Sequence, residues 1–239
     1  MENLTPKYKR VLIKLSGEAL AGKAGHGFDY EVIDRVVEEI KKIHEMDVQI
    51  ALVIGAGNFW RGRQGTQMDR TTADHMGMLA TVMNSLAMME ALEAHGMQTR
   101  VQSAIAMDAV AEPYVLRRTL HHFKNRKIVI IAGGTGHPYC STDTAAALRA
   151  SEIGADILLM AKNVDGIYDS DPKLNPNAVK YDHINYLDII KNGIKAMDLT
   201  AATMCMENDI PALAFALDEK DSLIKAVCGQ KIGTLIDNK

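Results

Sequence analysis

The sequence is poor in cysteine and has no excess of positive charge. Only three of its 239 residues are cysteines, Cys140, Cys205 and Cys228, an odd number spread far apart. A disulfide framework needs denser, paired cysteines in an oxidising compartment, so we expect reduced thiols and a cytoplasmic location. Lysine and arginine number 27 against 30 aspartates and glutamates, a net charge of −3. This balance excludes the broad basic field that holds a nucleic-acid backbone, and no nucleic-acid partner is expected.

Long apolar runs are also missing. No run approaches the ~18 residues that suggest a membrane span, so no membrane partner is expected. The N-terminal segment MENLTPKYKR has no apolar stretch after its charges, and we expect no signal peptide. His137 and Cys140 have the spacing of zinc ligands, but a second pair is missing from their neighbourhood. Because a structural zinc site needs a full tetrahedral set, no metal-ligand set is predicted.

What the sequence does contain is an alternation of strand-like and helix-like segments. Expected strands are residues 11–13, 49–54, 99–102, 127–131, 156–160 and 210–215, with a short edge strand at 234–236. Most are continuous apolar runs, which are typical of a parallel sheet covered on both faces. Residues 29–46 predict an amphipathic helix with Asp29 as its N-cap. The alternation predicts a three-layer αβα sandwich around a mainly parallel sheet, with residues 1–239 as a single domain.

A methionine-rich segment, residues 71–95, predicts a helix that is apolar on more than one face. Such a helix is buried on several sides. Two interpretations remain open. The helix lies wholly in the core, or one of its faces meets another subunit, a role that suits adaptable methionine side chains.

Glycine-rich segments follow several predicted strands, where open parallel sheets bind their ligands. Residues 14–17 (KLSG) place a lysine beside backbone amides, as a transferring phosphoryl group requires. Residues 55–58 (GAGN) let a ligand approach the backbone closely. Arg61, which follows them, can bind a phosphate through two parallel hydrogen bonds from its guanidinium. Residues 133–143 carry polar groups that can form hydrogen bonds with the edge of a nucleobase. Their last residue, Asp143, either orients a catalytic lysine or complements a helix dipole.

Two other phosphate motifs are excluded. Residues 17–24 nearly match the pattern G-x-x-x-x-G-K-[ST], but Ala24 lacks the hydroxyl that would hold magnesium. The glycine after residues 55–57 is Gly62, which breaks the dinucleotide pattern G-x-G-x-x-G and disfavours a nicotinamide cofactor. Residues 162–172 follow another strand and carry turn signals at Asp165-Gly166 and Asp171-Pro172.

Taken together, these segments resemble the amino acid kinase superfamily and, within it, the bacterial uridylate kinases. The resemblance runs over essentially the whole chain and is carried by residues 14–18 (KLSGE), 74–80 (DHMGMLA), 135–143 and 164–172. It implies phosphoryl transfer from ATP to UMP with Mg²⁺, in pyrimidine nucleotide biosynthesis. It also implies a homohexamer that GTP activates and UTP inhibits.

The matching motifs imply roles for individual residues. Lys14 is implied to contact the transferring group, with Asp143 holding it in place. The implied ATP side comprises Lys14, Leu15, Ser16, Gly17, Gly57, Arg61, Lys162, Asn163, Tyr168 and Asp171. The implied UMP side comprises Ala56, Asp74, Thr135, Gly136, His137, Pro138, Tyr139, Cys140, Ser141 and Thr142. The region matching the GTP effector site comprises Gly22, Lys23, Ala24, Gly25, His26 and Gly27.

Two residues depart from the family pattern. Ala56 stands where the family has a glycine, and His137 stands where it has an asparagine. Neither change removes a charged group. Two rival functions remain: another kinase of this fold acting on an amino acid or carbamate, and a nucleotide-sensing regulator that binds without turnover.

Overall fold

The computed structural model describes residues 5–60, 68–172 and 174–239. The strands are β1 (Arg10–Leu15), β2 (Gln49–Ile54), β3 (Thr99–Ser103), β4 (Glu112–Pro113), β5 (Ile128–Ala132), β6 (Ile157–Lys162), β7 (Ile167–Tyr168), β8 (Lys180–Tyr181), β9 (His183–Asn185), β10 (Ala212–Ala216) and β11 (Thr234–Asp237). The helices are α1 (Gly17–Leu20), the short 3₁₀ helix η1 (Gly22–Ala24), α2 (Tyr30–Glu45), α3 (Arg70–Ala94), α4 (Leu116–Lys124), α5 (Thr142–Ile153), α6 (Tyr186–Asn192), α7 (Leu199–Glu207) and α8 (Ser222–Val227).

Nine of these strands form one sheet in the order β4-β3-β5-β2-β1-β6-β10-β11-β9, and β7 pairs with β8 in a separate ribbon. Neighbours in the large sheet run parallel, except that β10 and β11 are antiparallel. β1 lies in the middle, with Lys14 paired to Val53 of β2 and to Met160 of β6. The carboxyl ends of these three strands therefore meet at one edge of the sheet.

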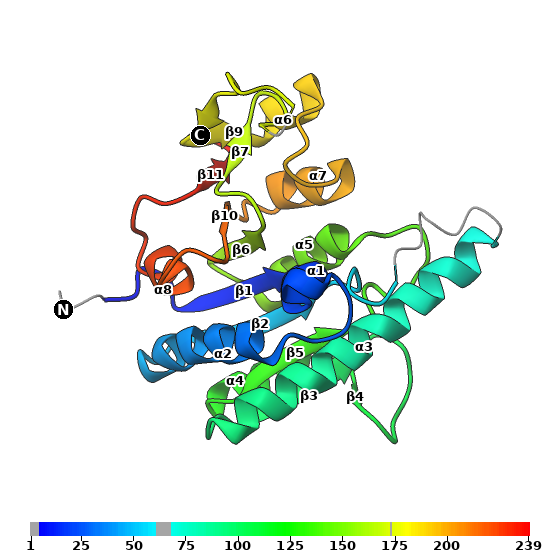
Figure 1. Cartoon of the computed structure of the whole chain (residues 1–239). Coiled ribbons are helices and arrows are strands. Elements are labelled where there is room, and N and C mark those ends of the chain that lie inside the picture. The colour runs from blue at the N-terminus through cyan, green and yellow to red at the C-terminus, as the bar shows by residue number, and fades with distance from the viewer. Residues whose placement is uncertain (1–4, 61–67, 173) are drawn as a thin grey trace.

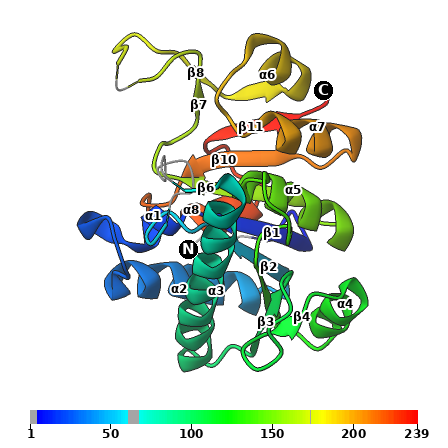
Figure 2. The same cartoon turned by 90° about the vertical axis from the view of Figure 1, so that its right-hand side faces the viewer.

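Helices cover both faces of the sheet (Figures 1 and 2). Alternate side chains of a strand point to opposite faces, and β1 follows this rule. Val11, Ile13 and Leu15 pack into a core with α2, α3 and α8, whereas Leu12 packs into a second core with residues of α4, α5, α6 and α7. The predicted three-layer sandwich is confirmed.

One strand was misplaced by sequence reasoning. We expected residues 234–236 to form an edge strand, but β11 lies one position inside the edge, because β9 pairs with its outer side. β9 is only three residues long and reads His-Ile-Asn. Since only one of its residues is apolar, neither length nor periodicity distinguishes it from a loop.

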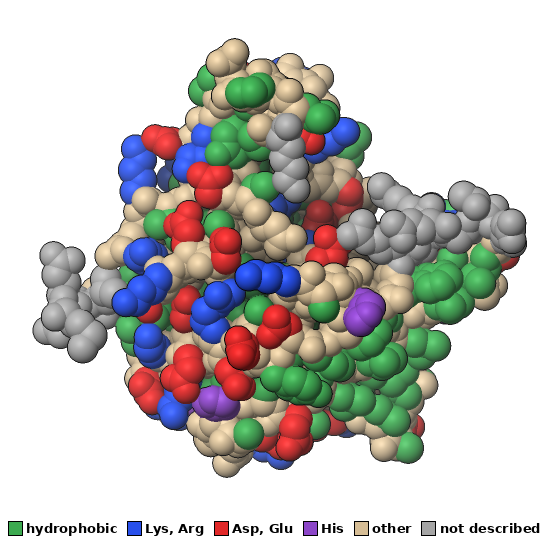
Figure 3. All heavy atoms as spheres, in the orientation of Figure 1, with side chains coloured by type: hydrophobic (Ala, Val, Ile, Leu, Met, Phe, Trp, Pro, Cys, Tyr) green, Lys and Arg blue, Asp and Glu red, His purple; other side chains and the backbone are tan. Residues whose placement is uncertain are grey.

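The methionine-rich segment forms α3, whose two faces differ. Met78, Val82, Met88 and Leu92 are buried in the core. On another face, the exposed fraction is 51% for Leu79 and 50% for Met83. Figure 3 shows apolar side chains gathered on the surface along α3. The core interpretation therefore holds for one face only. None of the helices in the described residues is both long enough and apolar enough to cross a membrane.

Candidate active site

An ion pair lies at the carboxyl edge of the sheet. Lys14, the penultimate residue of β1, places its Nζ 3.0 Å from Oδ1 of Asp143, and the two side chains are only 14% and 20% exposed. Asp143 is there because Ser141 caps α5: the Ser141 hydroxyl accepts hydrogen bonds from the amides of Asp143 and Thr144. The cap starts the helix at Thr142 and fixes the carboxylate in its first turn.

A second lysine faces the same carboxylate. Lys162 ends β6, is partly buried, and donates a hydrogen bond to the carbonyl of Ala196. Burial alone would raise the pKa of Asp143, but the ammonium groups of Lys14 and Lys162 outweigh it and hold that pKa below its usual value. Burial lowers the pKa of Lys162, while Asp143 opposes this effect. Asp143 therefore stays ionised at neutral pH between two cationic side chains.

The turns after β1 and β2 touch one another. A Cβ atom at Gly17 would lie 2.4 Å from the carbonyl oxygen of Gly55 and 2.7 Å from the amide nitrogen of Gly57. Only glycine allows this approach. Ser16 precedes α1 as its N-cap residue, so this short helix begins directly after β1, the strand that carries Lys14.

An asparagine pair supports these turns from below. Asn84 is fully buried in α3 and donates to the carbonyl of Gly55 at 2.6 Å. The side chains of Asn84 and Asn58 also exchange hydrogen bonds of 2.7 and 2.9 Å. Asn58 donates further to the carbonyl of Gly27 at 2.8 Å. The turn after β2 is thereby tied both to α3 and to the loop after η1.

One cavity, of about 470 Å³, opens on the α3 side of the ion pair. Seven of the residues predicted for UMP line it: Ala56, Asp74, Thr135, His137, Cys140, Ser141 and Thr142. Three others, Gly136, Pro138 and Tyr139, do not. Tyr139 instead donates its amide to the Asp74 carboxylate at 2.8 Å, and Arg70 pairs with that carboxylate at 2.8 Å. The cavity thus presents two carboxylates, those of Asp74 and Glu18, together with several hydroxyls and an imidazole.

A second cavity, of about 400 Å³, lies between β6, the β7–β8 ribbon and the end of α6. Lys162, Tyr168 and Asp171 line it as predicted, whereas Asn163 is exposed and does not. Gly57, also predicted for ATP, lines the first cavity instead. The Tyr168 hydroxyl donates to Asp165 at 2.7 Å, which fixes the ring at the cavity wall. Lys162 thus connects this cavity with the ion pair.

Comparison with known proteins identifies the family. Residues 9–215 match the family described as "Amino acid kinase family". The chain belongs to the amino acid kinase family. Among solved structures it is similar to a UMP kinase from Bacillus anthracis, with 39% identity, 97% of each chain covered and a TM-score of 0.94. A UMP kinase from Ureaplasma parvum shares 38% identity over 96% of this chain and 99% of that one, with a TM-score of 0.91. A uridylate kinase from Archaeoglobus fulgidus is 26% identical over 95% and 99%, with a TM-score of 0.73.

The remaining predicted residues of this amino acid kinase family member take varied positions. Leu15 is buried in the core below the site. Arg61 lies outside the described residues. The predicted effector loop comprises residues 22–27, and Lys23 to His26 within it are exposed. The Gly27 amide donates a hydrogen bond to the Asn58 carbonyl at 3.1 Å. In the described part of the chain, no cluster of three or more His, Cys, Asp or Glu side chains forms a metal-binding group.

Several site residues escaped sequence reasoning. Trp60 and Met78 line the first cavity, and residues 192–195 line the second. Asp198 accepts hydrogen bonds from the hydroxyls of Ser141 and Thr144 and caps α7. Asn84 was missed as well, because α3 carries other polar residues, such as Thr81 and Ser85, and the sequence does not distinguish Asn84 from them.

Proposed function

We propose that this member of the amino acid kinase family is a UMP kinase, which converts ATP and UMP into ADP and UDP. The observation that carries the proposal is the partly buried Lys14–Asp143–Lys162 group, which lies between a cavity on the α3 side and a cavity on the β7–β8 side. Two UMP kinases that are 39% and 38% identical over nearly the whole chain support the choice of substrate.

We assign the cavity beside α3 to UMP and the cavity beside the β7–β8 ribbon to ATP. A phosphate oxygen of UMP attacks the γ-phosphorus of ATP, the bond to the β,γ-bridging oxygen breaks, and ADP leaves. The attacking phosphate is already largely dianionic at neutral pH, with a second pKa near 6, so no strong general base is needed. Catalysis then depends on positioning and on charge neutralisation.

The two lysines neutralise charge that develops on the transferring group. Their ammonium groups are held by Asp143 before substrates arrive, so little reorganisation is needed at the moment of reaction. The amides of the turns after β1 and β2 complete the phosphate site. Mg²⁺ enters as part of the MgATP substrate, which suits a cation that is held mainly by phosphate oxygens and water.

We assign three further properties to the chain. The exposed apolar face of α3, which includes Leu79 and Met83, joins copies of this chain into a homohexamer. GTP activates through the loop at residues 22–27, and UTP inhibits. The chain acts as a single catalytic domain in the cytoplasm, in pyrimidine nucleotide biosynthesis. M83E, a charged substitution on the exposed face of α3, should dissociate the assembly in light scattering. A wild-type particle of monomer mass would refute the assembly.

The test of the reaction is ADP release measured with UMP, CMP, glutamate, N-acetylglutamate and carbamate, with and without GTP. We expect turnover with UMP and a gain with GTP. K14A should lower kcat on the order of 10²–10³-fold, as the loss of one oxyanion donor does. K124A changes an exposed lysine of α4 and should leave kcat unchanged. UTP binding without any UDP formation would instead indicate a nucleotide-sensing regulator, and turnover with glutamate or carbamate another kinase of the fold.

A further inference from the structure

A buried arginine lies behind the glycine-rich turn that follows β5. Arg149 of α5 is 5% exposed, although arginine is almost never buried without a partner. Its Nη1 donates to Glu152 at 2.7 Å, and its guanidinium lies 4.0 Å from the ring centre of Tyr114. The Tyr114 hydroxyl donates to the same Glu152 oxygen at 2.7 Å. Three side chains thus hold one another in a fixed arrangement.

The free edge of this guanidinium faces the turn. Nη2 of Arg149 approaches the carbonyl oxygen of Gly134 at 3.5 Å, and its Nε is buried with no hydrogen-bond partner. Gly134 has φ +60° and lines the cavity assigned to UMP, next to Thr135. Gly133 and Gly136 also have positive φ, so this turn has little side-chain packing of its own to hold it.

Resting on the proposed function, we propose that Arg149 is a positioning residue for UMP: braced by Glu152 and Tyr114, it sets the Gly134 carbonyl and thereby the nucleotide-facing Thr135. The other fixed point of the turn is the Gly133 amide, which donates to the Thr81 hydroxyl of α3 at 2.9 Å. The turn is therefore held from α3 on one side and from α5 on the other. The cavity assigned to ATP touches neither of these two supports of the turn, because it is lined by other segments.

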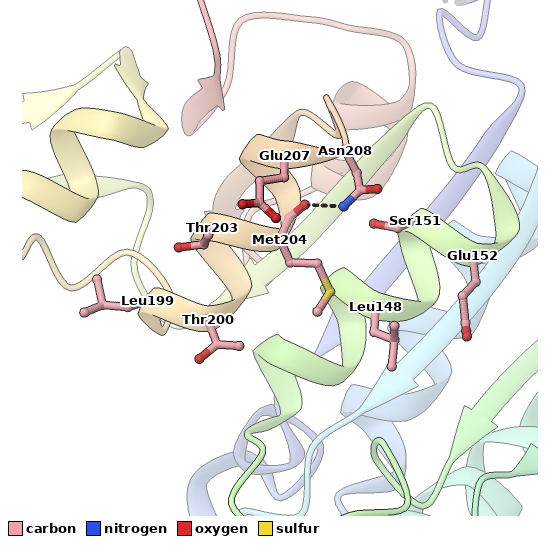
Figure 4. A pocket seen from close by; sticks show the side chains of 9 residues that line it. All are labelled: Leu148, Ser151, Glu152, Leu199, Thr200, Thr203, Met204, Glu207 and Asn208. Atoms are coloured by element: carbon pink, nitrogen blue, oxygen red, sulfur yellow. Dashed lines mark hydrogen bonds between the residues drawn. The ribbon is translucent and has the colours of Figure 1, made fainter.

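Glu152 neutralises the charge of Arg149, so we do not assign this arginine to a ligand elsewhere. Glu152 also borders a groove of about 770 Å³ between α5 and α7. Figure 4 shows its side chain pointing away from α7, whereas Ser151 points toward it. Burial and the neighbouring carboxylate raise the pKa of Tyr114, so its hydroxyl remains a donor at neutral pH. The bracing of Arg149 therefore persists over the working pH range.

The test separates UMP binding from ATP binding. Trp60 is the single tryptophan of the chain and lines the UMP cavity, so its fluorescence reports UMP binding without turnover. We expect R149M to raise the Kd and KM for UMP roughly tenfold, the scale of losing a hydrogen bond to a charged group. R149K keeps the charge without the planar fork and should recover part of the loss. The KM for ATP should stay within about twofold, because R149M leaves the ATP cavity intact.

Two variants keep the test decisive. Y114F retains Arg149 and Glu152 but loses the bracing hydroxyl. It should raise the Kd for UMP even if R149M fails to fold. S151A lies on the same helix, on the side that faces α7, and should change neither constant. Variants that lose thermal stability while the Kd for UMP stays at the wild-type value would overturn the inference. A wild-type chain that neither binds nor phosphorylates UMP would overturn the proposed function instead.

Discussion

Replacing Asp143 by asparagine tests the charge arrangement of the site most directly. At 3.0 Å and an effective dielectric constant near 20, the attraction between Lys14 and Asp143 is about 5 to 6 kcal/mol. Desolvation of both groups offsets part of this, and removing one partner of a buried pair costs about 3 kcal/mol or more. Asparagine keeps the size of the side chain but leaves two ammonium groups facing each other. Because Asp143 no longer holds the Lys14 ammonium in place, we expect kcat to fall about 100-fold, the scale of losing one oxyanion-hole donor.

The same variant should shift the pH profile in a defined direction. Asp143 raises the pKa of Lys162 against the effect of burial, so its removal lowers that pKa further. In the proposed mechanism Lys162 acts in its protonated form, so we expect activity to be lost as pH rises through the pKa of Lys162. The alkaline limb of the kcat profile should therefore move to lower pH in D143N.

The assay is steady-state ADP release with MgATP and UMP over a range of pH, with thermal unfolding measured in parallel. D188N is the matched control, because Asp188 also lies in the first turn of a helix, α6, but is exposed. A folded D143N whose kcat stays within about threefold of wild type would refute the reasoning, since the lost charge corresponds to a far larger change. An alkaline limb that stays in place or moves upward would refute the assignment of Lys162.

Three further predictions concern stability. G17A places a Cβ 2.4 Å from the Gly55 carbonyl and should cost about 1–3 kcal/mol in urea unfolding. G77A, with 3.6 Å to its nearest neighbour, should cost nothing, and equal effects would contradict the packing argument. N84A leaves the Gly55 carbonyl and Asn58 without their partner and should cost about 1–3 kcal/mol by the same measurement, whereas the exposed-site variant N177A should not. Burial raises the pKa of Glu112, but hydrogen bonds from His122 and Gln102 outweigh it and lower that pKa below 4.5. Its contribution to stability is therefore present at neutral pH and lost as pH falls below that value. E112Q should flatten this part of the stability–pH curve, and parallel curves for E112Q and wild type would count against the pairing.

Much of the sheet was predictable because its central strands are continuous apolar runs. The predicted strand at residues 49–54 coincides with β2, and the predicted helix at 71–95 differs from α3 by one residue at each end. The short elements could not be predicted. α1, β7, β8 and β9 have two to four residues each, too few for a periodic pattern.

The site was predictable in its residues more than in its contacts. Lys14 and Asp143 stood out because each adjoins a predicted strand or helix end. Lys162 was assigned to the ATP side without a contact to Asp143, and its interaction with Asp143 depends on the placement of α5 over the sheet. Asn58 and Asn84 are 26 positions apart, and their pairing requires α3 to cross the end of β2. Such contacts are set by tertiary packing, which local patterns do not encode.

The reciprocal amide bonds of Asn58 and Asn84 have a consequence for communication within the molecule. They join the loop ending at Gly27, the backbone at Gly55 and the long helix α3 through bonds of 2.6 to 2.9 Å. Any ligand or neighbour that favours one placement of that helix or loop must favour the matching placement of the Gly55 turn. Because thermodynamic linkage is reciprocal, we expect a ligand that shifts the Gly55 turn to shift α3 as well.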